Sequence, residues 1–358
     1  MEYQSESANA RGENIVPEEE LHRTFHYTGL CYALLLGLHL ALAFGISFLL
    51  ARFAPDVYRG PWGLYLSDTL PFYLVAVPLC AILMYRLPRQ VPQKRRIGAA
   101  RYTMMLLVAV LFLVAGALVG NFVNMILKAI TGNPPSNISD TISGGNVFVT
   151  LLMVGVLAPV VEEFIFRKVL IDGVRRFGES IAILLSGLVF GLAHGNFGQC
   201  FYAVGLGLVF AYIYCKSGKL YLTIIPHVVI NSMSVILTYK VMPRAMEVYD
   251  VLPQLMESGM TDEVIAVLRA GIVPLILMLL YVFIEYNAAF VGFIVLLLRR
   301  RSISFEPCYL ILQTKSDANG NTLYHRPARA TIFRTAFGNI GMLVLGIIIL
   351  FYFVMSIL

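Results

Sequence analysis

Long apolar runs are the feature that most limits what this chain of 358 residues can fold into. A helix that crosses a bilayer needs about 20 mostly apolar residues. Nine runs approach or exceed that length, and they cover residues 28–51, 64–85, 103–129, 146–170, 180–197, 200–215, 220–241, 264–298 and 330–357. The eighth run is long enough to be one tilted helix or two shorter segments around Pro274 and Glu285.

The low charge content points the same way. Charged residues make up 13% of the chain, whereas soluble domains carry about 25%. We therefore predict an all-α fold, a polytopic membrane protein of about eight to nine transmembrane helices.

Lysines and arginines gather in alternate loops, after the second, fourth, sixth and eighth runs. They are Arg86, Arg89, Lys94, Arg95, Arg96 and Arg101; Lys168, Arg175 and Arg176; Lys216 and Lys219; and Arg299, Arg300 and Arg301. If nine spans alternate, all these loops share one side, which the positive-inside rule makes cytoplasmic. We expect a multi-pass protein of the cell membrane with its N-terminus in the cytoplasm and its C-terminus outside. Lipid is the expected surrounding, and nucleic acid is not an expected partner because the basic residues form no stripe.

Two segments lie outside the apolar runs. Residues 1–27 are polar and lack the apolar core of a cleaved signal, so they predict a disordered cytoplasmic tail. Residues 305–328 hold two β-prone stretches around Asn319-Gly320, which predict a short cytoplasmic hairpin. The expected organisation is therefore the tail, N-terminal spans over 28–140, a core over 141–241, and C-terminal spans over 242–358 that include the hairpin.

The cysteines predict neither a disulfide framework nor a thiolate metal site. There are five of them, with no CxxC and no paired spacing. Most lie in apolar runs, where a buried thiol behaves as a small hydrophobic side chain.

Two adjacent carboxylates near the end of the fourth run are the first candidates for chemistry. Ionisable groups inside membrane segments are costly and usually mark function. Glu163 and Arg167 are four residues apart, share a helix face and can form an ion pair. Glu162 lies about 100° away around the helix and faces a different neighbour. We predict one paired carboxylate and a second that suits general-base work on water.

Two histidine pairs follow at the same spacing. Phe190 and His194 are four residues apart in the fifth run, and His227 and Asn231 are four apart in the seventh. An imidazole that orients water and two donors that stabilise an oxyanion would complete a set for amide hydrolysis. By residue count, His194 lies roughly 20 Å and His227 roughly 10 Å from their span starts, with Glu162 close to the cytoplasmic end.

Together these motifs resemble those of the CAAX-protease and bacteriocin-processing family of intramembrane proteases, which includes the type II CAAX prenyl endopeptidases. That family carries EExxxR, FxxxH and HxxxN in this order on successive helices. The resemblance covers roughly residues 145–240 and implies a conical or bundle-like catalytic core.

Carried over position by position, the resemblance implies that Glu162 and His194 activate the water. It makes Glu163, Arg167 and Phe190 supporting residues, with His227 and Asn231 as oxyanion stabilisers. Chemistry without a metal is the favoured interpretation. Zinc is the alternative, held by Glu162, His194 and His227, although the HExxH spacing is absent.

We therefore expect an endopeptidase that cuts near the C-terminus of a prenylated CAAX-type peptide, or of a bacteriocin-like or pheromone-like peptide. One alternative is a proton-coupled transporter using Glu162, Glu163 and Glu285 as a relay; another is a catalytically silent immunity or scaffold protein. Of the remaining ionisable residues, His39 and Asp68 favour structural roles, and Glu285 is the best unassigned candidate. The sequence leaves the oligomeric state open.

Overall fold

Helices dominate the computed structural model, which describes residues 15–60, 62–132, 146–314 and 322–357. In the N-terminal half these are α1 (Glu18–Phe53), α2 (Pro55–Arg59), η2 (Tyr65–Thr69), η3 (Phe72–Ala76), α3 (Val77–Met84), α4 (Ala99–Thr131), α6 (Val147–Thr150), η4 (Leu151–Leu157), α7 (Ala158–Glu163), η5 (Phe164–Val169), α8 (Leu170–Val174) and η6 (Arg175–Phe177). The rest are α9 (Glu179–Leu192), α10 (Phe197–Ser217), α11 (Tyr221–Ile236), η7 (Leu237–Val241), α12 (Met242–Ser258), α13 (Asp262–Arg299), η8 (Arg300–Ser302), α14 (Arg329–Phe337) and α15 (Ile340–Met355).

Seven helices in the described residues are long and apolar enough to cross a membrane, and the bent pair α14 and α15 makes an eighth. The predicted all-α polytopic fold is confirmed. The fifth apolar run explains why nine runs do not give nine full spans: α9 has only 14 residues and ends at Leu192. A turn with Gly195 in the left-handed region (φ 66°) follows it.

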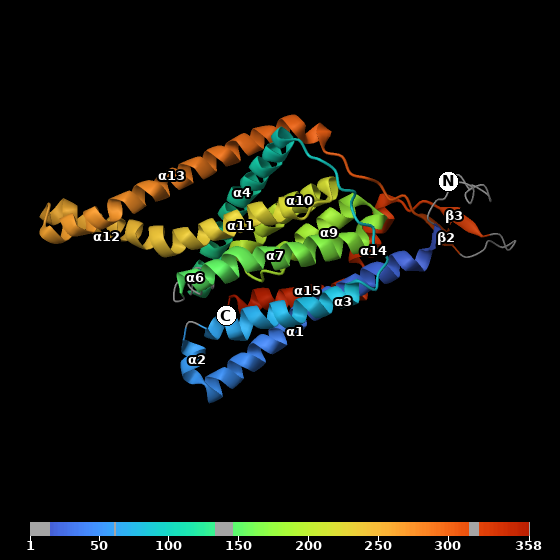
Figure 1. The fold of residues 1–358 in the computed structure, drawn as a ribbon, viewed down its shortest axis with the longest axis horizontal. Coiled ribbons are helices and arrows are strands. Elements are labelled where there is room, and N and C mark those ends of the chain that lie inside the picture. Colours follow the sequence, from blue (N-terminus) through green and yellow to red (C-terminus); the bar gives the residue numbers. More distant parts are fainter. Residues whose placement is uncertain (1–14, 61, 133–145, 315–321, 358) are drawn as a thin grey trace.

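The spans differ from the apolar runs at several ends. The fourth span continues to Phe177, because η5, α8 and η6 follow the glutamates without a break. The eighth run is one helix, α13, with Pro274 inside it. The seventh continues through η7 into α12, and Figure 1 shows α12 and the start of α13 extending beyond the other helices. The ninth bends by 55° between α14 and α15.

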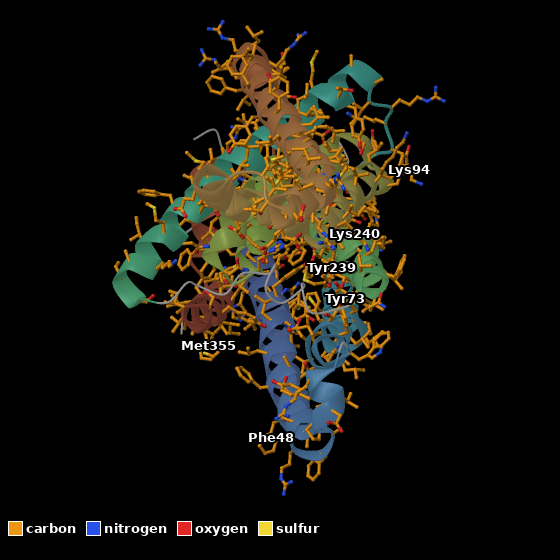
Figure 2. The ribbon with its side chains drawn as sticks, turned by 90° about the vertical axis from the view of Figure 1, so that its left-hand side faces the viewer. Phe48, Tyr73, Lys94, Tyr239, Lys240 and Met355 are labelled. Atoms are coloured by element: carbon orange, nitrogen blue, oxygen red, sulfur yellow. The ribbon has the colours of Figure 1, made fainter. Side chains whose placement is uncertain are left out.

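Apolar side chains cover much of the outer surface. Phe48 of α1 is 69% exposed and points away from the other helices in the end-on view of Figure 2. In α13 only 6% of the most apolar window is buried within the protein. Apolar surface on this scale needs a non-aqueous partner, and the acyl chains of a bilayer supply it.

The predicted tail is wrong for residues 15–27. Residues 15–17 form strand β1 (Ile15–Pro17), and α1 begins at Glu18, where three glutamates in the first turn suit the positive end of the helix dipole. Contacts distant in sequence hold this end, because Glu20 pairs with Arg176 and the ring of Phe25 packs on Phe177. The N-terminal 14 residues of the predicted tail lie outside the described residues.

A small sheet lies beside the start of α1. Strand β1 pairs in parallel with β2 (Ile311–Thr314), and β2 pairs antiparallel with β3 (Leu323–His325). The two strands of the predicted hairpin are therefore present, and β1 is an addition to it. The Asn319-Gly320 turn lies outside the described residues.

The basic loops meet on one face of the protein, which we call the basic face: residues 85–98, 175–179, 216–220 and 299–308. The backbone N–H of Arg95 donates to Ser217 O (2.8 Å), and that of Glu179 donates to Glu306 O (3.0 Å). Arg175 also pairs with Glu306, at 2.5 Å. These contacts agree with the prediction that the basic loops share one side.

The first and last spans run in the same direction. Gly29 of α1 lies against Gly341 of α15, and further along both helices Tyr352 Oη donates to Leu36 O. The start of α1 is at the basic face, so α15 ends toward the opposite side of the protein (Figure 1).

The close approach of α1 and α15 generates a first prediction. A Cβ added at Gly341 would lie 2.0 Å from His26 O, whereas one added at Gly346 on the same helix would meet nothing within 4 Å. We expect Gly341→Ala to lower the free energy of unfolding by about 1–3 kcal/mol through overpacking. Gly346→Ala should be neutral or slightly stabilising, because alanine favours helix. Reversible unfolding in detergent micelles measures both, and equal effects would contradict the packing of α1 on α15.

Candidate active site in the membrane

A fully buried ion pair lies at the centre of the candidate site. Arg167 Nε and Nη2 donate to the two carboxylate oxygens of Glu163 at 3.0 and 3.1 Å, and both side chains are 0% exposed. The third nitrogen, Nη1, donates to Ser186 Oγ at 3.0 Å. The guanidinium also stands 4.5 Å over the ring of Phe190. The predicted Glu163–Arg167 pair is therefore present, and each of its charges is compensated.

His227 joins this pair through one ring nitrogen. Its Nδ1 lies 3.1 Å from Glu163 Oε1, in a ring that is almost completely buried. A carboxylate paired with arginine can only accept hydrogen bonds, so Nδ1 carries the proton. The other nitrogen, Nε2, points at Glu162 Oε2 from 3.6 Å.

Glu162 differs from its neighbour. Its side chain is 19% exposed, and its Oε2 is a buried oxygen without a hydrogen-bond partner among the described residues. The 3.6 Å separation from His227 is too long for a hydrogen bond. Tyr73 and Tyr202 lie close enough to interact electrostatically with Glu162. The two adjacent glutamates are thus one saturated and one available carboxylate.

His194 lies on the other side of Phe190. Its Nδ1 donates to Phe190 O (2.9 Å), so in the neutral ring Nε2 has a free lone pair. The Phe190 ring meets His194 and His227 edge-on, with centroids 5.1 and 5.7 Å apart. Among the described residues, no hydrogen bond joins His194 to Glu162.

The predicted difference in depth between Glu162 and His194 is wrong. The fourth span continues to Phe177 and α9 begins at Glu179, and both of these ends lie at the basic face. Glu162 and His194 are each 15 residues from the nearer of these two ends. Counted from these ends at 1.5 Å per residue, both lie roughly 22 Å deep. The two helices therefore bring Glu162 and His194 to a similar level.

Asn231 contacts the backbone of η4. Its Nδ2 donates to Val154 O (3.2 Å), and the next residue, Ser232, donates to Gly155 O (3.2 Å). Pro159 has no N–H for Gly155 O, and the Ala158 N–H bonds to Met153 O. The helix thereby leaves two carbonyls for α11 to satisfy. One amide proton of Asn231 is used in this way, and among the described residues no acceptor for the second is found.

Sequence reasoning missed two supporting residues, Ser186 and Thr223. Ser186 holds Arg167, and the buried Thr223 hydroxyl faces Glu163. Each lies four residues before a motif: Ser186 before Phe190, and Thr223 before His227. Extending each helix face back by one turn would have identified both.

The zinc alternative does not fit the side-chain positions. Within the described part of the chain, no three His, Cys, Asp or Glu side chains form a group that could hold a metal ion. The suggested ligands Glu162, His194 and His227 are therefore not gathered around one point, and we derive no step through a metal.

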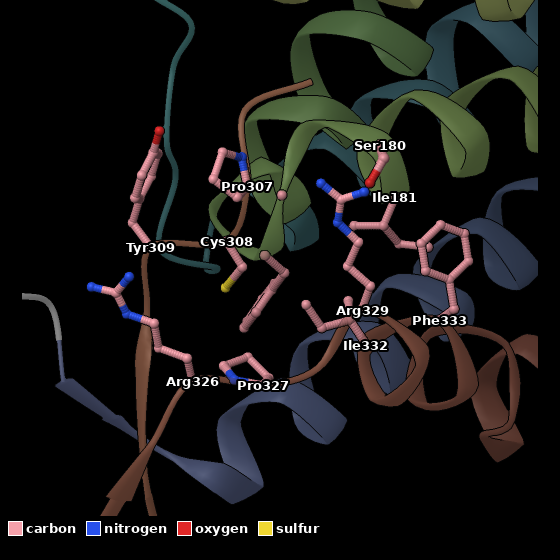
Figure 3. A pocket seen from close by; sticks show the side chains of 12 residues that line it. Ser180, Ile181, Pro307, Cys308, Tyr309, Arg326, Pro327, Arg329, Ile332 and Phe333 are labelled. Carbon is pink, nitrogen blue, oxygen red and sulfur yellow. The ribbon is translucent and has the colours of Figure 1, made fainter. Parts of the chain in front are cut away.

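A separate cavity of about 210 Å³ lies at the basic face, where α9, the segment before β2 and α14 meet (Figure 3). Phe177, Cys308 and Arg329 are among its lining residues. Burial raises the pKa of the Cys308 thiol, so little thiolate is present at neutral pH. None of the residues that line this cavity belongs to the glutamate or histidine motifs, and Cys308 is a poor candidate for a nucleophile.

Fold and site together define the class: a polytopic helical membrane protein with an intramembrane cluster of two glutamates, an arginine and two histidines. Residues 144–233 match the family model "Type II CAAX prenyl endopeptidase Rce1-like". Over this segment the chain is similar to that family, which agrees with the resemblance to the CAAX-protease and bacteriocin-processing family. All the candidate site residues fall within the matched segment.

Two curated bacterial proteins are similar over part of their length. "Membrane-embedded CAAX protease MroQ" of Staphylococcus aureus (strain USA300) is 33% identical over 93 residues, which are 24% of this chain and 38% of the relative. "Putative membrane peptidase YdiL" of Bacillus subtilis (strain 168) is 23% identical over 111 residues, 31% of this chain and 46% of the relative. The chain thus spans less than half of each relative. No solved structure matches.

The buried pair generates a second prediction. Arg167→Ala leaves Glu163 as an uncompensated buried charge, and we expect a loss of about 3–5 kcal/mol in stability. The matched control is Arg244→Ala, which breaks the exposed Arg244–Glu247 pair of α12 and should change stability by less than about 0.5 kcal/mol. Unfolding in detergent measures both variants, and an Arg167→Ala protein as stable as the control would contradict the central role of the pair.

Proposed function

We propose that this protein is an intramembrane endopeptidase in which Glu162 activates a water molecule. One observation carries the proposal: of two adjacent membrane carboxylates, Glu163 is saturated by Arg167, whereas Glu162 has a bare buried oxygen facing His227. The match of residues 144–233 to the prenyl endopeptidase family supports it.

Charge balance defines the protonation of the site. Glu163 and Arg167 cancel, so Glu162 and His227 together are neutral when they share one proton. That proton is on Nε2 of His227 when Glu162 is a carboxylate, or on Glu162 when His227 is neutral. A low-dielectric site favours these two neutral arrangements over any with net charge. The first arrangement supplies a base and a donor at once.

Hydrolysis then follows from these groups. Glu162 removes a proton from water as the oxygen attacks the carbonyl carbon, and the carbonyl oxygen becomes an oxyanion. His227 Nε2–H and the second amide proton of Asn231 donate to that oxyanion. Glu162 next gives its proton to the amide nitrogen as the C–N bond breaks, which yields a carboxylic acid and an amine.

His194 has a supporting part in this scheme. Its Nδ1 proton is committed to Phe190 O, so Nε2 can accept a hydrogen bond from the attacking water and orient it. We propose chemistry without a metal cofactor, and we retain zinc only as an outcome of the experiment below.

The substrate we propose is a membrane-associated peptide cut near its C-terminus. The family description and the name of the staphylococcal relative point to a CAAX-type terminus, prenylated in the family's namesake reaction. A bacteriocin-like or pheromone-like peptide is the second candidate. We further propose that the basic face is cytoplasmic, that the site opens toward it, and that the C-terminus lies outside the cell membrane.

Two other functions are less well supported. A proton relay would need carboxylates that change protonation, and Glu163 is committed to Arg167. Glu285 pairs with Tyr281 of its own helix, at 3.3 Å. A silent scaffold has no need for the available oxygen of Glu162 beside an oriented His227.

The third prediction tests the base. Glu162→Gln keeps the shape of the side chain but cannot take a proton, so cleavage should fall by at least about 10²–10⁴-fold while the fold is retained. The assay uses purified protein in detergent and a panel of lipidated and unlipidated C-terminal peptides, with and without chelator. Glu285→Gln is the matched membrane carboxylate and should cleave like wild type.

Three outcomes would change the proposal. Cleavage that survives Glu162→Gln would remove Glu162 as the base. Activity that chelator abolishes and zinc restores would favour the metal alternative. Loss of proton-coupled uptake into vesicles in Glu285→Gln, with no cleavage by any variant, would favour the transporter.

The fourth prediction separates chemistry from helix support at Asn231. Asn231→Ala and Ser232→Ala each remove one side-chain donor to a carbonyl of η4. Only Asn231 is proposed to meet the oxyanion, so Asn231→Ala should lower kcat by about 10²–10³-fold, and Ser232→Ala far less. Equal losses in the two variants would show that Asn231 acts through the helix alone.

A further inference from the structure

A second ionisable cluster lies in the membrane part of the protein, outside the catalytic motifs. His39 of α1, Asp68 of η2 and Tyr352 of α15 come together from three helices. His39 Nε2 lies 3.0 Å from Asp68 Oδ1, and His39 Nδ1 lies 2.9 Å from Tyr352 Oη. Asp68 is half exposed and His39 is mostly buried. A histidine and an aspartate within membrane segments are costly even when they are paired, so their presence in this protein suggests a role.

The donors and acceptors of this cluster can be assigned from the Tyr352 hydroxyl. Tyr352 Oη donates its only proton to Leu36 O at 3.0 Å. The same oxygen must therefore accept from His39, whose Nδ1 carries a proton. Nε2 of His39 and the Asp68 carboxyl then need a further proton between them. The chain Asp68, His39, Tyr352 and Leu36 O is thus fully satisfied, and it fixes the Tyr352 side chain on α1.

Tyr352 supports the turn that carries His194. A Cβ added at Gly195 would lie 2.7 Å from Tyr352 Cβ, so the backbone of the turn rests directly on this side chain. Two residues after Gly195, the ring of Phe197 packs on the ring of Phe353, the neighbour of Tyr352, with centroids 4.7 Å apart. Gly195 has φ 66°, a conformation that glycine adopts without strain.

The other side of the turn is held by α10. Asn196 Oδ1 accepts from the Gln199 N–H, and Asn196 Nδ2 donates to His194 O. His194 therefore sits on a short turn with α10 on one side and α15 on the other. Movement of Tyr352 would release one of these two supports.

We propose that Asp68, His39 and Tyr352 are positioning residues that fix the His194 turn of the catalytic centre. The turn carries the imidazole proposed to orient the attacking water, so the idea rests on the proposed function only for its catalytic consequence. The claim that the three residues fix the turn depends only on the contacts described above.

Hydrogen–deuterium exchange of the protein in lipid nanodiscs tests this claim without a substrate. The amides of Ala193, His194 and Gly195 donate to Val189 O, Gly191 O and Leu192 O and exchange only when the turn opens. Tyr352→Phe keeps the ring against Gly195 and removes the hydroxyl, and Asp68→Asn removes the carboxyl group that shares a proton with His39. We expect exchange in 193–195 to rise about five- to tenfold in each.

Tyr281→Phe is the matched control, because it removes a tyrosine hydroxyl that bonds to a membrane carboxylate on α13. Exchange in 193–195 should stay at the wild-type rate in this variant. Wild-type rates in both Tyr352→Phe and Asp68→Asn would overturn the proposal, as would an equal rise in Tyr281→Phe.

Cleavage kinetics then test the catalytic consequence. Tyr352→Phe and Asp68→Asn should lower kcat about tenfold with KM unchanged, because they disturb the water and not the peptide site. Faster exchange with unchanged kcat would make the cluster purely structural. Faster exchange in a protein that cleaves nothing would leave the positioning intact and remove the proposed function.

Discussion

The buried pair of Glu163 and Arg167 is the interaction on which the rest of the site depends. A buried arginine is tolerable only when its charge is compensated and its nitrogens find acceptors, and Glu163 and Ser186 provide one for each of the three nitrogens of Arg167. Ser186 lies on α9 and His227 on α11, so the same pair links the helices that carry both histidines to the helix of the glutamates. Glu163 then holds a proton on Nδ1 of His227 and so turns Nε2 toward Glu162. The position of His227 beside the unpartnered oxygen of Glu162 is a consequence of this arrangement.

Backbone chemistry supplies a second link between these helices. Pro159 interrupts the hydrogen bonds of the glutamate-bearing helix, and the neighbouring π-helical segment redirects the Ala158 N–H. Freed carbonyls inside a membrane must find partners, and Asn231 and Ser232 of α11 supply them. The irregular helix therefore supplies the acceptors for Asn231 and Ser232, and these two side chains satisfy the carbonyls that the irregular helix leaves free. A regular helix at this position would leave Asn231 without its acceptor.

Local spacing was enough to predict part of this site. Residues four apart share a helix face, which gave the Glu163–Arg167 pair and the separation of Glu162 from it. The lengths of the apolar runs were enough to predict the polytopic fold. The start of α1 could not be predicted, because its polar first turns are held by Arg176 and Phe177, about 150 residues away. The early end of α9 could not be predicted either, because the turn at Gly195 lies inside a continuous apolar run. The meeting of His39 with Asp68 and Tyr352 depends on how three helices pack.

The features that the sequence could not predict share one physical cause, and the same cause affects the candidate site. In the membrane, apolar side chains determine that a segment is a helix but say little about where it sits, since lipid and protein are equally apolar partners. Polar contacts therefore decide the arrangement: Arg167 with Ser186, Asn231 with Val154 O, and Tyr352 with Leu36 O. Such contacts join helices that sequence patterns treat as independent. The candidate site is held by few polar bonds, so we expect that a change in a span without any of its motifs can still move His194.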